Sequence, residues 1–330
     1  MYEIRHSLTF FAFLTLSVLL VLISYLGRWD GGIYKNLNDS DDSRAAMQDS
    51  HFSNSKYFLT TNNLKSMRLV SKEFMFNTSL QKNYAVELKG SIFTKDNTEV
   101  FYEGDKGVFD EKLEKLTLNG NVHMESGGTK GDANKMDYYS ALSYAELFGE
   151  VKTSSYYEEQ KDYIEVEGDY AKVFTEKEIS LFRGHVKGKV LRAKRYEESL
   201  YFFSDQLDMN LASGKMSLNG NVTIKKQLLT AESRRGEIFL QNYNKKLKYF
   251  VLYDDVKVVE EVLLGGDTPM KRRSYSEKLE GLMAESKAVL TGYPKVYQQN
   301  DVIKGSKIIL RENTEVIEVI DANTNILIKE

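Results

Sequence analysis

The sequence predicts an all-β repeat protein preceded by one transmembrane helix. Three observations lead to this fold class: a recurring glycine or aspartate step before a valine, a period-2 alternation of apolar and polar residues, and an uncharged stretch near the N-terminus. Composition agrees, because 2 Pro, 21 Tyr and 17 Phe in 330 residues are typical of strands whose turns are built without proline.

The repeat consists of six steps, in each of which a strand-like stretch ends in Gly or Asp and continues into a valine. The steps are Leu118-Asn119-Gly120-Asn121-Val122, Leu147-Phe148-Gly149-Glu150-Val151, Phe182-Arg183-Gly184-His185-Val186, Leu218-Asn219-Gly220-Asn221-Val222, Leu252-Tyr253-Asp254-Asp255-Val256 and Leu290-Thr291-Gly292-Tyr293-Pro294-Lys295-Val296. Successive valines of these steps lie 29 to 40 residues apart, a drifting period that is typical of stacked supersecondary units. Such a stack provides a long surface or groove and not a compact catalytic pocket.

Each unit has one apolar and one polar face. From Met216 to Ile224 the even-numbered residues are apolar or glycine and the odd-numbered ones are polar, and Leu116 to Met124 repeat the pattern. Because Gly120 and Gly220 share the apolar parity, we expect a column of glycines that thins the inside of the stack. The residues expected to face inward are Leu118, Val122, Leu147, Val151, Phe182, Val186, Leu218, Val222, Leu252, Val256, Leu290 and Val296.

The N-terminal segment predicts a membrane anchor. Residues 8–26 carry no charge, and a helix of that length spans roughly 28 Å, about the hydrocarbon thickness of a bilayer. A cleaved signal peptide is the alternative, but Gly27-Arg28-Trp29-Asp30 offers no small-x-small cleavage site. With no cysteine in the chain, a lipid-modified cysteine and disulfides are both excluded. We therefore expect a flank at 1–7, an anchor at 8–26 and a flexible Gly/Asn/Asp/Ser-rich tether at 27–55.

Two later segments interrupt the repeat. Residues 262–273 contain Gly265-Gly266-Asp267 and Pro269 and predict a longer loop. Residues 274–290 are expected to be strands, although an amphipathic helix is an alternative.

No motif in the chain predicts catalysis. A Walker-type loop, a G-x-S-x-G elbow and an H-E-x-x-H pattern are all missing from the sequence. The histidines and the carboxylate pairs Glu165/Glu167 and Asp254/Asp255 are expected to be solvated surface groups. We expect no catalytic residue, no metal site and no cofactor, and a net charge of −3 gives no reason to expect nucleic acid.

Two basic clusters stand out on the otherwise balanced chain. Arg192-Lys194-Arg195 and Lys271-Arg272-Arg273 are expected to be solubilising or to protect strand edges. The alternative is that one of them meets the phosphates of an anionic lipid.

The repeats resemble the OstA/LptA/LptC superfamily of lipopolysaccharide export. Residues 99–124, with Gly104-Asp105-Lys106-Gly107 followed by the first step, are similar to an LptC domain, and residues 288–310 are similar to the closing unit of an OstA-type domain. The resemblance implies an elongated, twisted antiparallel β-jellyroll whose sheets face each other and are open along one side. It divides the chain into an LptC-like β-jellyroll at 56–190 and LptA/OstA-like repeats at 191–330, with the twelve inward residues named above as the lipid-binding groove.

The function implied by this resemblance is lipid transfer. The chain is expected to be a non-enzymatic, single-pass inner-membrane protein with its bulk in the periplasm. Its expected partners are lipopolysaccharide, the ABC-type extractor made of LptB, LptF and LptG, and a periplasmic LptA-like protein joined by end-to-end strand addition. The alternative is a membrane-tethered structural or assembly protein that binds partners by edge-strand addition. A polysaccharide-processing enzyme is a third hypothesis, and it lacks the clustered carboxylates or metal site that it needs.

Overall fold

The computed structural model describes residues 50–322 except for gaps at 62–63, 94–97, 127, 158–161, 175, 192–198, 242–246, 263–269, 312–313 and 315. Residues 47–330 form one compact unit. The predicted flank, the anchor at 8–26 and the tether up to residue 49 lie outside the described residues. In the part of the chain that is described, no helix has the length and hydrophobicity needed to cross a bilayer.

The described residues form one antiparallel sheet of nineteen strands with two short 3₁₀ turns. The strands are β1 (Ser50–Thr61), β2 (Leu64–Asn77), β3 (Lys82–Phe93), β4 (Glu99–Asp110), β5 (Lys115–Ser126), β6 (Thr129–Tyr139), β7 (Tyr144–Tyr157), β8 (Asp162–Phe174), β9 (Ile179–Leu191), β10 (Leu200–Asn210), β11 (Lys215–Lys226), β12 (Leu229–Leu240), β13 (Leu247–Val262), β14 (Met270–Leu282), β15 (Lys287–Thr291), β16 (Lys295–Gln298), β17 (Asp301–Lys304), β18 (Lys307–Arg311) and β19 (Ile317–Ile320). The 3₁₀ turns are η1 (Ser140–Leu142) and η2 (Met283–Glu285).

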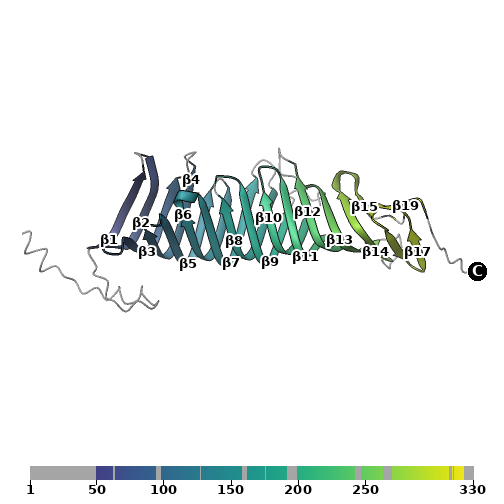
Figure 1. Cartoon of the computed structure of the whole chain (residues 1–330), viewed down its shortest axis with the longest axis horizontal. Helices are drawn as coiled ribbons and strands as arrows, with labels where there is room; N and C mark the ends of the chain where they lie inside the picture. Colours follow the sequence, from purple (N-terminus) through teal and green to yellow (C-terminus); the bar gives the residue numbers. More distant parts are fainter. Residues whose placement is uncertain are drawn as a thin grey trace, which may run out of the picture. The chain divides into compact units, whose positions relative to one another are not determined.

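The sheet is a meander, because each strand from β1 to β14 pairs with its neighbours in the chain. Figure 1 shows the strands following one another in chain order. The pairing is continuous where the sequence division near residue 190 falls, since β9 and β10 pair from Leu200↔Val190 to Asn210↔Ile179.

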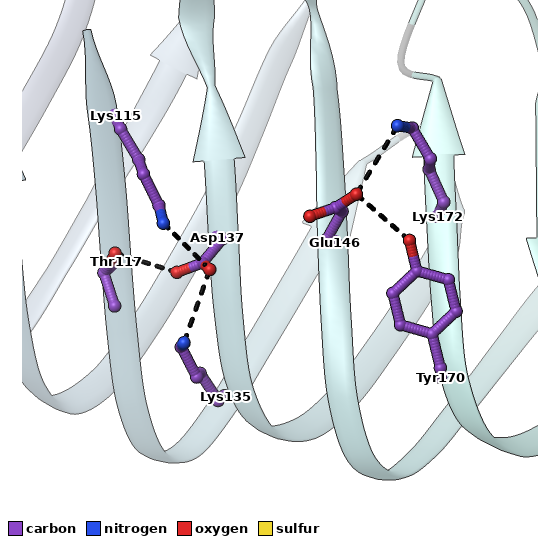
Figure 2. A network of polar contacts seen from close by, with 7 residues as sticks. All are labelled: Lys115, Thr117, Lys135, Asp137, Glu146, Tyr170 and Lys172. Atoms are coloured by element: carbon purple, nitrogen blue, oxygen red, sulfur yellow. Dashed lines mark hydrogen bonds and ion pairs between the residues drawn. The ribbon is translucent and has the colours of Figure 1, made fainter. Parts of the chain in front are cut away.

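A corner folds this sheet into two layers. In β11 the pairing with β12 shifts between Asn219 and Val222, and Gly220 and Asn221 between them have φ of 74° and 46°. Two left-handed residues in a row form a bulge that bends the strand sharply. Figure 2 shows the ribbons of neighbouring strands bending at one level and continuing behind. We call layer 1 the segments of odd-numbered strands after their corner, such as Val222–Lys226, and layer 2 the segments before it, such as Lys215–Asn219, each with the even-numbered strand segments paired to it.

The corners coincide with the six steps found in the sequence. Positive φ is found at both central residues of each step: Gly120 and Asn121, Gly149 and Glu150, Gly184 and His185, Gly220 and Asn221, Asp254 and Asp255, and Gly292 and Tyr293. The all-β prediction is confirmed, and the steps mark where each strand passes from one layer to the other.

The expectation that the step glycines thin the interior is wrong. A Cβ on Gly220 would meet the side chain of Asp205, which is exposed on the outside of the bend, where Asn221 Nδ2 also donates to Asp205 Oδ2 at 2.9 Å. The parity argument failed only at the corner itself, because Gly220 and Asn221 have positive φ and are not extended, and the alternation of buried residues resumes at Val222.

Other glycines do lie inside, each under an aromatic ring of a neighbouring strand. Gly188 is the cross-strand partner of Phe202, whose ring covers the position that a Cβ would take, and Gly281 stands in the same relation to Phe250. These pairs let large rings lie flat in a narrow interior.

Two further sequence expectations can be compared with the strands. β1 begins at Ser50, so residues 50–55 of the predicted tether are strand instead, because they pair with Glu73, Phe74 and other residues of β2 despite their polar composition. Residues 274–290 are β14, η2 and β15 as expected, and not an amphipathic helix. Of the predicted loop at 262–273, the described residues are strand instead, with Val262 ending β13 and residues 270–273 beginning β14, and 263–269 lie outside the described residues.

We predict that Gly188→Ala destabilises the protein by about 1–3 kcal/mol, because the added Cβ overlaps the fully buried Phe202 ring. The control is Gly104→Ala, whose Cβ would lie 3.5 Å from Leu118 Cβ, an ordinary contact. Urea unfolding of both variants measures the difference, and equal stability of the two would contradict the packing of ring on glycine.

Candidate functional site

The twelve residues predicted to face inward all lie between the two layers. Each is 0–2% exposed, and all belong to one hydrophobic cluster that includes residues from Met67 in β2 to Leu310 in β18. The structure therefore brings the whole predicted set together. Whether these side chains contact lipid is a separate matter and stays a prediction.

The corner places the two apolar residues of each step on facing layers. Leu218 ends its layer 2 segment and Val222 begins its layer 1 segment, and the two left-handed residues between them return both side chains to the interior. A Cβ on Gly236, in β12, would lie 3.2 Å from Val222 Cγ1 and 3.5 Å from Leu218 Cδ1. Gly236 thus leaves room beside both side chains near the corner, where a Cβ would crowd Val222.

The interior is filled by its own side chains. Phe202, Ile224 and Ala231 are each fully buried, so the space between them is not open to an acyl chain in this conformation. A cavity of ≈ 190 Å³ lies elsewhere, on β1–β3, and its lining includes Lys56, Phe58 and Arg68. An acyl chain could therefore reach the twelve residues only if the layers moved apart.

One side of the layer pair is suited to such a movement. The strand pairings run between neighbouring segments of the same layer, so backbone continuity joins the layers at the corners. The turns of both layers lie on the side opposite the corners. Along layer 2, consecutive turns are tied to one another by backbone bonds such as Glu111 N→Gln81 O at 3.0 Å and Leu211 N→Glu178 O at 3.0 Å. These bonds stiffen the edge of one layer without closing the gap to the other.

The two ends of the sheet differ in length. β1 presents twelve residues and pairs, among the described strands, with β2. Phe52 and Phe58 on it are 49% and 54% exposed. The opposite end consists of the four-residue strands β17 and β19. A long edge strand with exposed aromatic residues is a surface on which another strand can pair.

Sequence reasoning missed a charged group inside the apolar interior. Arg272 is 0% exposed and its Nη2 donates to Glu260 Oε2 at 2.6 Å, so the expectation that the 271–273 cluster is a solvated surface patch is wrong for its central residue. Its parity was the available signal, since Arg272 alternates with Lys271 and Arg273 in the register of the buried Ser274. The other basic cluster, at 192–195, lies outside the described residues.

The groups that could have suggested an enzyme are engaged in exposed pairs. His185 lies 2.8 Å from Asp169 Oδ2 at a corner, and Asp254 accepts from Arg235 Nε at 2.6 Å. Burial raises the pKa of Glu165, but Lys189 and Lys152 outweigh it and hold the pKa below its usual value. A carboxylate that stays ionised in this way is unsuited to act as a general acid. Among the residues that the structure describes, no three His, Cys, Asp or Glu are placed to hold a metal ion.

The outer face of layer 2 carries a polar network that Figure 2 shows in close-up. Asp137, 7% exposed, accepts from Thr117 Oγ1 at 2.8 Å and lies 3.0 Å from Lys115 Nζ and 3.4 Å from Lys135 Nζ. On the next strands Glu146 accepts from Tyr170 Oη at 3.1 Å and Lys172 Nζ at 3.4 Å. The lysines also lie over aromatic rings, as Lys172 Nζ does at 3.8 Å from the Tyr144 ring centre. The network joins the outward side chains of neighbouring strands in layer 2.

The same arrangement recurs one hundred positions later. Lys215 binds Glu237 as Lys115 binds Asp137, and Asn221 binds Asp205 as Asn121 binds Asp105, both at 2.9 Å. The repeated contacts include the corner and the outer face, so β4–β6 and β10–β12 are equivalent structural units.

We predict that Asp137→Asn lowers the free energy of unfolding by about 1–3 kcal/mol at pH 7. Burial raises the pKa of Asp137, but its contacts with Lys115, Thr117 and Lys135 lower the pKa by more. The pKa of Asp137 is therefore below its usual value. A depressed pKa gives stability that is present above the unfolded value of about 3.9 and is lost as the pH falls through the folded value. Urea unfolding should show the difference from wild type shrinking below about pH 4.

The control is Asp208→Asn, which removes an exposed carboxylate of β10. It should leave stability nearly unchanged at both pH 7 and pH 3. A constant deficit for Asp137→Asn across this range would show that the carboxylate charge is not what stabilises the site.

Comparison with known proteins identifies one part of the chain. Residues 202–316 match the family described as LptA/(LptD N-terminal domain) LPS transport protein. No curated protein matches the chain. Among solved structures, LptH, the LptA-homologous periplasmic component of the lipopolysaccharide transport device of Pseudomonas aeruginosa, aligns with 10% identity and a TM-score of 0.35 over 40% of this chain and 95% of that one. At that level the alignment says nothing about function.

The match includes β10 to β18 and leaves 56–190 untested, so the LptC-like character of that part stays a prediction. The family's description is of transport proteins and not of enzymes, in agreement with the sequence analysis. Residues 202–316 of this chain are therefore similar to the family of LptA and the LptD N-terminal domain, described as LPS transport proteins.

Proposed function

We propose that this protein binds lipopolysaccharide and passes it along the interior between its two layers, while an N-terminal helix at 8–26 holds it in the inner membrane. The observation that carries the proposal is the single hydrophobic cluster that contains all twelve apolar side chains from Leu118 to Val296, along one side free of strand pairing. The transport family matched by residues 202–316 supports the choice of lipid.

The energetics suit transfer better than storage. Each methylene that leaves water for an apolar interior gains about 0.8 kcal/mol. Separating the layers gives up packing between side chains such as Leu218 and Val222, but an acyl chain replaces those contacts with chemically similar ones. Since neighbouring steps offer the same kind of side chain, no single position becomes a deep trap.

The sugar and phosphate portion would remain in water at the open side. The energy for movement would come from the ABC-type extractor of LptB, LptF and LptG, because the chain has no nucleotide-binding motif. The twelve-residue free edge of β1 is the proposed surface for strand addition, with an LptA-like protein as the partner.

A photo-crosslinking amino acid placed at Val122, Val186 or Val222 should label lipopolysaccharide in cells. The matched controls are Lys187, which follows Val186, and Lys225, three residues after Val222; both are exposed and should give at least fivefold less lipid adduct. Adducts are measured by immunoblot for lipopolysaccharide. Equal labelling at both faces would contradict an interior route.

The same method distinguishes lipid transfer from the second candidate function, that of a membrane-tethered assembly protein. That function is favoured by the exposed Phe52 and Phe58 on the free edge. Crosslinkers at these two positions should label a protein in either case. Protein adducts at the edge with no lipid adduct at any interior valine would establish the assembly protein instead.

The proposed anchor has its own test. Replacing Leu19 and Leu20 with arginine places two charges near the centre of the 8–26 stretch, and each costs about 2.5–3.5 kcal/mol of insertion free energy. The wild-type chain should remain with membranes after carbonate extraction and keep its first residues by mass spectrometry, whereas the double variant should be released. A mature wild-type chain that begins after residue 26 would show a cleaved signal.

A further inference from the structure

Arg272 connects the two layers on their open side. Its Nε and Nη2 donate to Glu260 Oε2 at 3.1 and 2.6 Å, and both residues belong to layer 1, where they are cross-strand partners. Its Nη1 donates to the carbonyl oxygen of Thr314 at 3.2 Å, and Nη2 reaches that of Arg311 at 3.5 Å. Arg311 ends β18 and pairs with Lys287 in layer 2. The guanidinium therefore spans the gap from layer 1 to layer 2.

The contacts of Arg272 lie on the side of the layers opposite the corners. Arg272 is near the start of β14 and Arg311 is at the end of β18, so both lie close to the turns and far from the corner. Hydrogen bonds at this place hold the layers together where no strand pairing does so.

Nearer the N-terminus, the interior contains apolar side chains in layer 1. In β9 to β11 the inward side chains of layer 1 include Val190, Phe202 and Ile224, all at most 2% exposed. Contacts between such groups can be exchanged for contacts with an acyl chain at little cost, because both are apolar.

The contacts of Arg272 cannot be exchanged in this way. An acyl chain has no acceptor for a guanidinium, so separation of the layers at β14 would leave a charge that is 0% exposed without two of its partners. Separation would leave the Arg272–Glu260 pair intact within layer 1, but the guanidinium would lose both carbonyl acceptors of the other side, and hydrogen bonds from a charged donor are among the strongest in a protein.

We propose that Arg272 and Glu260 form a clamp that closes the interior at β13–β14 and β18, so that an acyl chain in the β5–β12 section stops there until the clamp opens. The clamp residues position the layers and are not a lipid-binding site. This inference rests on the proposed function for its lipid, but the closure itself is a property of the fold.

The test compares crosslinkers on the two sides of the clamp, at Val222 in β11 and at Ile308 in β18, both buried in the interior. In the otherwise wild-type full-length chain, lipopolysaccharide should be labelled at Val222 and at least fivefold less at Ile308. The double substitution Arg272→Met with Glu260→Leu removes both charges and keeps the volume, so that no unpaired ion is left to unfold the protein. It should raise labelling at Ile308 to the level at Val222.

Arg311→Met is the matched control, because the clamp uses only its backbone carbonyl while its side chain binds Glu318 on the surface. This variant should keep the wild-type pattern. Equal labelling of Val222 and Ile308 in the wild-type chain, or no gain at Ile308 in the double variant, would overturn the clamp as a limit on lipid movement.

Hydrogen exchange tests the closure without lipid. Amides of residues 307–311 in the detergent-solubilised full chain should exchange at least tenfold faster in the double variant than in wild type, while those of β5–β9 stay unchanged. Unchanged exchange in β18 would overturn the clamp whatever the lipid does. Faster exchange in β18 with no lipid adduct at Val222 in any variant would contradict the proposed function and the lipid part of this inference. The clamp would then be a structural contact between the layers only.

Discussion

The paired left-handed residues at the centre of each step are the constraint on which the rest of the structure depends. At Gly220 and Asn221 they bend β11 so that its two halves lie in different layers, and the next odd strand bends in the same way at Asp254 and Asp255. Without these corners, Leu218 and Val222 would lie along one face of a single-layered sheet and would have nothing to pack against. The bend therefore creates the interior, and the apolar side chains then stabilise the bend.

Much of the fold could be predicted from the sequence because each strand pairs with its neighbours in the chain. Period-2 alternation identified the inward residues on both sides of every corner, and all twelve are buried. What it could not identify was the direction of the step glycines, since Gly220 and Asn221 have positive φ and are not extended like the residues on either side. The glycines that do admit large rings, such as Gly188, are recognisable only from the register that sets them opposite Phe202.

Arg272 shows why composition can mislead inside a repeat. A triplet of basic residues predicts a solvated patch, yet in a strand the side chain of the middle residue points to the face opposite its two neighbours. Which face is buried depends on register, and register here depends on pairing with β13, where Glu260 lies opposite. The predicted membrane anchor lies outside the described residues, and the proposed lipid groove requires a separation of the layers that this conformation does not contain.

The meander topology gives the protein a simple way to change its length. Because β4–β6 and β10–β12 carry equivalent contacts and each contacts mainly its own neighbours, a block of hairpins can be duplicated without breaking any pairing elsewhere. Each added strand widens the sheet by about 4.8 Å. Duplication of such a block would lengthen the sheet and the apolar interior together, in small increments and without a new kind of contact.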